Sequence, residues 1–311
     1  GTLRITGGAF GNESPVTPVG GGRGLTLSLG PGSLIDIQPG GTIINGGWSA
    51  LTWVSGGVTN LATLNVDGAL DIWDGNNVYV DALTGSGTIR KNQSGANPVL
   101  YVGANNGSGA FSGAINGAGP SSTYYTLTKI GSGAQTLDGT VDNGSCRAQV
   151  NDGTIVLSKE NSDAAHAIGS GLTVAGGMAR LGSTGSGGDQ IYDGTWVAVN
   201  GGVFDMNGTN ETVKYLTGSG GSFSNSSSTQ ALVCINLCGV NGNPGGQTYS
   251  GSVGGNTRIL VINSNTKNTD VQTFSGNNTY SGGTIVSNGH LRITSDAGLG
   301  AVPGTFDAQN V

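Results

Sequence analysis

The feature that most constrains this chain is a unit of very short β-prone runs separated by turn residues. The clearest copy spans 271–294, where the runs Thr273–Phe274, Thr284–Val286 and His290–Ile293 are flanked by Gly, Asn and Ser. These flanking residues turn a backbone at little steric cost. Runs this short cannot bury an apolar face alone, so the unit is stable only if further copies stack on it and share one core.

The unit recurs in the same order in two parts of the chain. The matching segments are Leu64–Gly68 with Val197–Gly201, Leu83–Gly87 with Leu216–Gly220, Phe111–Ile115 with Tyr249–Val253, and Thr136–Gly139 with Thr273–Gly276. The offset drifts from 133 residues (197 − 64) to 138 (249 − 111), which indicates small loop insertions. We therefore predict a single repeat domain over residues 1–311, with two related blocks at about 60–195 and 196–311, as part of a longer array.

Composition favours strands over helices and over disorder. Glycine supplies 61 of the 311 residues, well below the one third that a collagen period demands. Charged residues make up only 10% of the chain. Apolar residues alternate with polar ones in short runs such as Leu34–Ile37 and Val78–Val80, a pattern typical of strands with one buried face. We expect no long helix.

Three all-β architectures use short strands and glycine turns: antiparallel sandwiches, propellers and parallel β-helices. A propeller needs four strands in about 40 to 50 residues with an aromatic signature in each blade, and none is found. Two-residue hairpin signals are not systematic either. Three strands in roughly 20 to 25 residues suit one triangular coil of a parallel β-helix. The predicted fold class is therefore all-β, a parallel β-helix (solenoid) with loop insertions.

Segments rich in Gly, Pro or Ser are expected to leave the stack as loops. These segments are Gly7–Gly24, Pro120–Tyr125, Ser222–Thr229 and Asn241–Gly246. The stretch Ser162–Gly169 could form one helical turn, and Ser295–Gly300 occupies the corresponding place in the second block.

Two motifs carry a resemblance to a known family. Leu127–Gly133 reads Leu-Thr-Lys-Ile-Gly-Ser-Gly and is followed by Thr136–Gly139, and Ser275–Thr284 reads Ser-Gly-Asn-Asn-Thr-Tyr-Ser-Gly-Gly-Thr. Both resemble the autotransporter-associated β-strand repeat, from about Leu64 onward. Thr140–Ser145 departs from the pattern because it lacks Asn-Thr-Tyr. The resemblance implies a right-handed parallel β-helix that is secreted or exposed on a bacterial cell surface, usually within a very long protein.

Charge and hydropathy argue against two classes of partner, nucleic acids and membranes. The formal net charge is −6 and no run of basic residues occurs, so nucleic acid is not an expected partner. No apolar run approaches the roughly 20 residues of a membrane helix, so this segment is not expected to insert in a membrane. We expect an extracellular or surface location with no cofactor; an export signal, if used, would lie outside this sequence.

Three cysteines, Cys146, Cys234 and Cys238, do not form a disulfide framework by number or spacing. On a straight strand Cys234 and Cys238 would lie roughly 13 Å apart, too far for a disulfide without a loop between them. Burial as small apolar residues is the simpler interpretation. With only His166 and His290 as histidines and no Cys-x-x-Cys, no metal site is predicted.

Catalysis has weak support in the sequence. Glycoside hydrolysis needs two carboxylates that flank the bond. Asp71 and Asp74 near Trp73 are the best local pair, and Asp205 matches Asp71 in the second block. Recurrence at one repeat position points to a strand or turn requirement instead, so we expect no enzyme activity.

Four tryptophans are the candidate binding residues. If their rings lie on the outside of the rod, they could stack against sugars; partial burial under loops is the competing interpretation. These residues are Trp48, Trp53, Trp73 and Trp196.

The two ends suggest contacts with further rungs. Gly1–Thr6 is repeated almost letter for letter as Gly289–Thr294, and Gly304–Asp307 reads as the start of a strand. Open strand edges at such ends pair readily with other strands. We expect adjoining repeats or other copies of the chain to meet there, with Leu3, Ile5, Phe306 and Val311 as the assembly residues.

Three functional hypotheses follow. The first is a non-enzymatic extracellular structural β-helix that acts as a bacterial surface spacer, fibre or adhesive stalk. The second is a subunit that assembles head to tail into filaments. The third is a β-helix that binds or cleaves surface glycans.

Overall fold

The computed structural model describes residues 1–11, 26–45, 51–55, 58–72, 76–91, 99–116, 125–160, 164–182, 189–237, 247–263 and 270–302. In these residues the structure is all-β, and nearly all strands pair in parallel. One short antiparallel pair, β5 (Val54–Ser55) with β6 (Val58–Thr59), and one 3-10 turn, η2 (Asp296–Leu299), complete the elements described. Parallel pairing excludes a sandwich of antiparallel hairpins.

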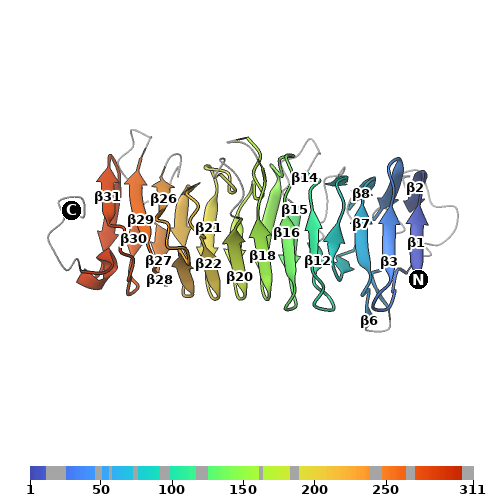
Figure 1. Ribbon diagram of the computed structural model, residues 1–311, viewed down its shortest axis with the longest axis horizontal. Coiled ribbons are helices and arrows are strands. Elements are labelled where there is room, and N and C mark those ends of the chain that lie inside the picture. Colours follow the sequence, from blue (N-terminus) through green and yellow to red (C-terminus); the bar gives the residue numbers. More distant parts are fainter. Residues whose placement is uncertain are drawn as a thin grey trace.

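The strands stack along the long axis of an elongated molecule, from β1 near one end to β31 near the other (Figure 1). They form three walls, which we name first, second and third.

The first wall contains two sheets joined by a bridge between Gly85 and Phe111. Its strands are β1 (Thr2–Ile5), β3 (Leu34–Ile37), β7 (Thr63–Val66), β10 (Leu83–Thr84), β13 (Gly109–Phe111), β16 (Ala134–Leu137), β18 (Thr154–Leu157), β20 (Met178–Leu181), β22 (Val203–Asp205), β25 (Ser222–Ser224) and β28 (Ser252–Val253).

The second wall likewise joins two sheets, here through a bridge between Gly218 and Tyr249. Its strands are β9 (Val78–Val80), β12 (Val99–Val102), β15 (Tyr125–Lys129), β17 (Cys146–Val150), β19 (Leu172–Val174), β21 (Trp196–Val199), β24 (Tyr215–Thr217), β27 (Gln247–Tyr249), β30 (Val271–Phe274) and β32 (His290–Ile293).

The third wall consists of two separate sheets. One contains β2 (Gly8–Gly11), β4 (Gly41–Ile44), β8 (Ala69–Asp71), β11 (Thr88–Arg90) and β14 (Ala114–Asn116); the other contains β23 (Glu211–Val213), β26 (Ala231–Asn236), β29 (Thr257–Ile262) and β31 (Thr284–Ser287). Along the chain, β10, β11 and β12 visit the first, third and second walls, and β13, β14 and β15 repeat this order. The architecture is consistent with a β-helix-like fold.

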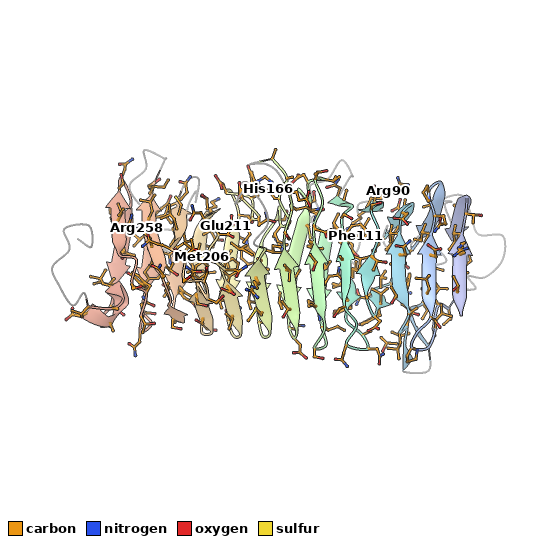
Figure 2. The ribbon with its side chains drawn as sticks, viewed as in Figure 1. Arg90, Phe111, His166, Met206, Glu211 and Arg258 are labelled. Carbon is orange, nitrogen blue, oxygen red and sulfur yellow. The ribbon has the colours of Figure 1, made fainter. Side chains whose placement is uncertain are left out.

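A single apolar core runs through the stack. Strands alternate buried and half-buried residues, as in β7, where Leu64 and Val66 point inward. The core extends from Ile5 to Tyr280, and larger side chains such as Phe111 and Met206 are fully buried in it (Figure 2). Full burial of one Leu, Ile or Val side chain contributes about 1.5–3 kcal/mol. We name one passage of the chain around the three walls a rung. Each rung obtains this contribution because the neighbouring rungs cover its inward side chains.

Buried amide side chains complete the hydrogen bonding where strands are short. Gln135 accepts a hydrogen bond from the N–H of Leu83 (3.1 Å) and donates one to its carbonyl (3.0 Å). Gln272 makes the same two bonds with Leu216, at 3.1 and 2.8 Å. These are positions that the repeat pattern matches. Unpaired buried amides are costly, so one glutamine in each block satisfies a strand two rungs away.

The matched glycines have an equally specific role. Gly85 and Gly218 have positive φ values of 103° and 134°. A Cβ at either position would collide with a backbone carbonyl oxygen in the rung below, that of Val66 or Val199. Only glycine tolerates both the conformation and the close approach.

Several predicted boundaries need correction. Gly8–Gly11 belongs to strand β2 and Ser222–Ser224 to β25, although both lie in segments predicted as loops. Ser162–Gly169 contains no helical turn in its described part, because Ile168 is extended and bridges to Ile191. Tyr125 opens β15. The η2 turn at 296–299 confirms a helical turn in the second block. The predicted loop at 241–246 lies outside the described residues.

The buried glutamines yield a stability prediction. Gln272→Leu keeps the volume but leaves the N–H and carbonyl of Leu216 without these partners, so the free energy of unfolding should fall by about 1–3 kcal/mol. Gln149→Leu on the same wall is the control, because Gln149 is half-buried and, among the described residues, its side-chain amide donates to Oδ1 of Asn151 rather than to a strand of another rung. Denaturant midpoints of both variants measure the difference. Equal midpoints would contradict the role assigned to Gln272.

Candidate functional site

The third wall is irregular between β14 and β23, in the middle part of the rod (Figure 2). The described backbone ladder there is reduced to a bridge between Ile168 and Ile191. Side chains form hydrogen bonds to the backbone there. The Asn143 side chain accepts from the N–H of Ile115 at 2.8 Å and donates to the carbonyl of Ala167 at 3.2 Å. A hollow opens on the surface of the rod in this irregular stretch.

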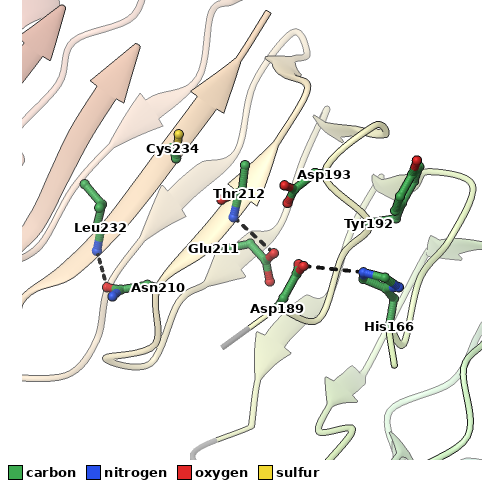
Figure 3. A pocket seen from close by; sticks show the side chains of 9 residues that line it. All are labelled: His166, Asp189, Tyr192, Asp193, Asn210, Glu211, Thr212, Leu232 and Cys234. Carbon is green, nitrogen blue, oxygen red and sulfur yellow. Dashed lines mark hydrogen bonds and ion pairs between the residues drawn. The ribbon is translucent and has the colours of Figure 1, made fainter. Parts of the chain in front are cut away.

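The hollow is an open cleft of about 430 Å³ (Figure 3). It is lined by His166, Asp189, Tyr192, Asp193, Asn210, Glu211, Thr212, Leu232 and Cys234. A turn closed by the N–H of Thr195 donating to the carbonyl of Tyr192 (2.8 Å) presents Tyr192 and Asp193. Strands β23 and β26 supply the opposite side. We name this hollow the wall cleft.

Glu211 is the most buried acid of the wall cleft, with 3% of its surface exposed. Its carboxyl oxygens accept the backbone N–H groups of Gln190 (3.0 Å), Thr212 (3.2 Å) and Ile191 (3.4 Å). Burial, reinforced by the neighbouring Asp189 carboxylate, raises the pKa of Glu211 well above its usual value. The charge of Asp189 thus favours the neutral form of the Glu211 carboxyl group.

Asp189 links Glu211 to a histidine. Its Oδ2 lies 3.4 Å from Nε2 of His166, and Nδ1 of the same ring lies 3.1 Å from Oδ1 of Asp142. Burial raises the pKa of Asp189, and the hydrogen bonds to Glu211 and His166 only partly offset this. The other oxygen, Oδ1, is enclosed without a hydrogen-bond partner. Asp142, His166 and Asp189 thus form one connected chain of titratable groups, and Glu211 lies close enough for the charge of Asp189 to raise its pKa.

The remaining lining residues are aromatic, polar or weakly reactive. Tyr192 is 51% exposed, and its ring meets that of His166 edge to face at 5.4 Å between centroids. Burial raises the pKa of the Cys234 thiol, so it is a poor nucleophile. Cys146 is a free, fully buried thiol whose pKa burial raises to about 12. Cys238 lies outside the described residues.

No group of three or more His, Cys, Asp or Glu side chains in the described residues is arranged to hold a metal ion. The carboxyl oxygens of Glu211 instead accept backbone N–H groups, and Asp189 faces His166.

The tryptophans predicted to bind glycans do not line the wall cleft. Trp53 is 1% exposed, so the expectation of an outward stacking face is wrong for this residue, whose ring belongs to the core. Trp196 is half-buried. Its ring lies so close to Gly171 that a Cβ added to this glycine would be 2.8 Å from the ring. Over the ring, the guanidinium carbon of Arg147 lies 5.7 Å from the ring centroid. Trp48 and Trp73 lie outside the described residues.

The candidate carboxylates have a structural role, as their recurrence indicated. Asp71 pairs with Arg90 on the neighbouring strand, with Nε to Oδ2 at 3.3 Å, and Asp205 pairs with Arg180 at 3.4 Å. In each case the two residues are directly opposite in the parallel register. Both aspartates are nearly fully buried. Asp74 lies outside the described residues.

The expected assembly residues are partly described. Leu3 is half-buried and Ile5 is 8% exposed, both in β1 at the edge of the first wall. At the other end, Ile285 and Val286 of β31 are exposed. Phe306 and Val311 lie outside the described residues, so their role stays a prediction.

The wall cleft could not be predicted from the sequence because its residues follow no motif. His166, Asp189 and Glu211 lie 23 and 22 residues apart (189 − 166; 211 − 189), about one rung each, so only the register brings them together. The one available signal was an acid followed by two β-branched residues, Glu211–Val213, in a chain with few charges.

Comparison with protein-family models, with curated proteins and with solved structures gave no match to this chain.

The acid pair generates a pH prediction. Both pKa values are raised in the folded state, so the stability they contribute is present below the unfolded carboxyl pKa of about 4 and is lost as pH rises through the folded values. Asp189→Asn removes the like charge beside Glu211. We expect the variant to lose less thermal stability than the wild type between pH 5 and pH 8.

Asp152→Asn is the matched control, because it removes an exposed carboxylate outside the wall cleft. Its melting temperature should follow the pH dependence of the wild type. If the melting temperature of Asp189→Asn falls with pH as steeply as that of the wild type, or more steeply, the effect of the Asp189 charge on Glu211 is contradicted.

Proposed function

We propose that this chain is a non-enzymatic structural rod, a right-handed parallel β-helix that acts as a spacer or adhesive stalk on the outside of a bacterial cell. The observation that carries the proposal is the single apolar core that extends from Ile5 to Tyr280 through three walls of parallel strands. A chain built this way gains length with every rung while each rung supports the next.

The mechanism of such a rod is mechanical. Parallel strands place their backbone hydrogen bonds between rungs, along the long axis, so that bending or stretching the rod must strain many bonds at once. Cross-strand pairs of a more exposed Arg with a buried Asp add contacts between rungs, as for Arg4 with Asp36 at 2.8 Å. These features support a stiff element rather than a hinge.

The outer surface supports an extracellular role. Large apolar side chains are exposed at few described positions: Val141, Tyr192, Ile285, Val286, Leu299 and Val302. No described helix is long and apolar enough to cross a membrane. An exterior of Thr, Ser and Asn keeps such a rod hydrated without a large net charge.

The packing of the repeat motif supports a place among the autotransporter-associated repeat proteins. Tyr280 of the Asn-Thr-Tyr motif is buried, and its hydroxyl shares a hydrogen bond of 2.6 Å with Oγ1 of Thr284. Asn278 accepts from the N–H of Val253 (2.8 Å) and donates to the carbonyl of Gly298 (2.8 Å). Asn143 makes the equivalent bonds in the first block, where the motif is otherwise absent.

A head-to-tail filament is the second candidate function. Strands β1 and β32 share Leu-Arg-Ile and lie at edges of their walls near opposite ends of the rod. Stacking of one end on the other would continue the parallel register and would form an open-ended polymer.

Electron microscopy of the purified chain tests the proposal. The first wall has 4 + 7 strands, which at about 4.8 Å per rung span about 50 Å. We expect stiff particles of one length, slightly above this value, at every protein concentration. Lengths that grow with concentration would favour the filament, and compact round particles would contradict the rod. Release of reducing sugars from a polysaccharide panel would contradict the absence of enzyme activity.

A further inference from the structure

We propose that the wall cleft is a saccharide-binding site, in which Tyr192 packs against a sugar ring while Asn210 hydrogen-bonds to its hydroxyls. The site differs from the tryptophans that the sequence indicated, and it would give the rod a place to hold a glycan.

The shape of the wall cleft suits a small polar ligand. Its volume of about 430 Å³ falls in the range of about 300–1,000 Å³ that is usual for ligand sites. Tyr192 offers a large exposed aromatic surface at its edge, and the contact with His166 holds the ring in place. Amphipathic rings of this kind pack on the C–H faces of sugars while their hydroxyl stays in water.

Unused polar groups of both kinds meet in the wall cleft. Asn210 accepts the N–H of Leu232 through Oδ1 at 2.8 Å, and its Nδ2 has no partner among the described residues. The Tyr192 hydroxyl is likewise without a described partner. Asp189 Oδ1 has no hydrogen-bond partner among the described residues, but it is enclosed and therefore out of a ligand's reach. The Asn210 amide can donate and the Tyr192 hydroxyl can donate or accept, which suits the neighbouring hydroxyls of a sugar.

The charge of the wall cleft selects among sugars. Its described lining includes Asp189, Asp193 and Glu211 and no Lys or Arg, so uronic acids and other anionic sugars are repelled. Burial and the charge of Asp189 raise the pKa of Glu211, which favours the neutral form of this carboxyl group and so reduces the negative charge of the wall cleft. Neutral sugars fit these conditions.

Titration of the purified chain with neutral trisaccharides tests the inference. Cellotriose, maltotriose and chitotriose are the probes, trigalacturonic acid is the anionic comparison, and binding is measured by calorimetry and by saturation-transfer NMR. We expect saturable binding of at least one neutral probe and weaker binding of the anionic one. Tyr192→Ala should lower the affinity about tenfold, and Asn210→Ala about threefold to tenfold.

Tyr101→Ala is the matched control, because it removes a tyrosine that stacks on Tyr79 at 4.5 Å on the second wall, away from the wall cleft. It should leave the affinity unchanged. The inference is overturned if no neutral probe binds, or if Tyr101→Ala lowers the affinity while Tyr192→Ala and Asn210→Ala do not. Either result leaves the particle length in electron microscopy unaffected, so it is distinguishable from a failure of the rod.

Discussion

The structure depends on the burial of each rung by its neighbours. No strand exceeds six residues among those described, and one wall of one rung offers two or three inward side chains. Such a small apolar surface does not offset the conformational entropy of ordering the rung. Stacking resolves this because the inward residues of successive rungs, such as Leu64 and Leu83 in the first wall, form one column. Parallel hydrogen bonds then hold the rungs at a fixed spacing.

The same constraint explains where polar groups are buried. Corners and short strands leave backbone amides without partners, and buried side chains such as Gln135, Gln272, Asn143 and Asn278 satisfy them. In the third wall Glu211 performs this task with a carboxyl group instead of an amide. Burial, together with the charge of the neighbouring Asp189, raises the pKa of this carboxyl group. The chemistry of the wall cleft thus arises from the same need for satisfied amides that shapes the rest of the rod.

Much of the fold could be predicted because its determinants are local. Alternation predicted the strands at 34–37 and 78–80, and His290–Ile293 is a strand with the predicted bounds. Ser222–Ser224 was missed because one Phe between serines has a weak strand signal, and pairing with the next rung decides its conformation. The burial of Trp53 was not predicted because apolar and polar residues do not alternate in the sequence around it. The wall cleft depends on the register of three distant segments, which no local pattern encodes.

Cysteine cross-linking tests the stacked parallel register most directly. In a chain with Cys146, Cys234 and Cys238 changed to alanine, Thr154→Cys combined with Met178→Cys places thiols on directly opposite residues of β18 and β20. Neighbouring strands lie about 4.8 Å apart, within the usual range for a disulfide, whereas Thr154→Cys with Arg180→Cys is a diagonal pair beyond it. The account predicts rapid oxidation of the first pair and little of the second. Equal oxidation of both pairs, or of the second alone, would contradict it.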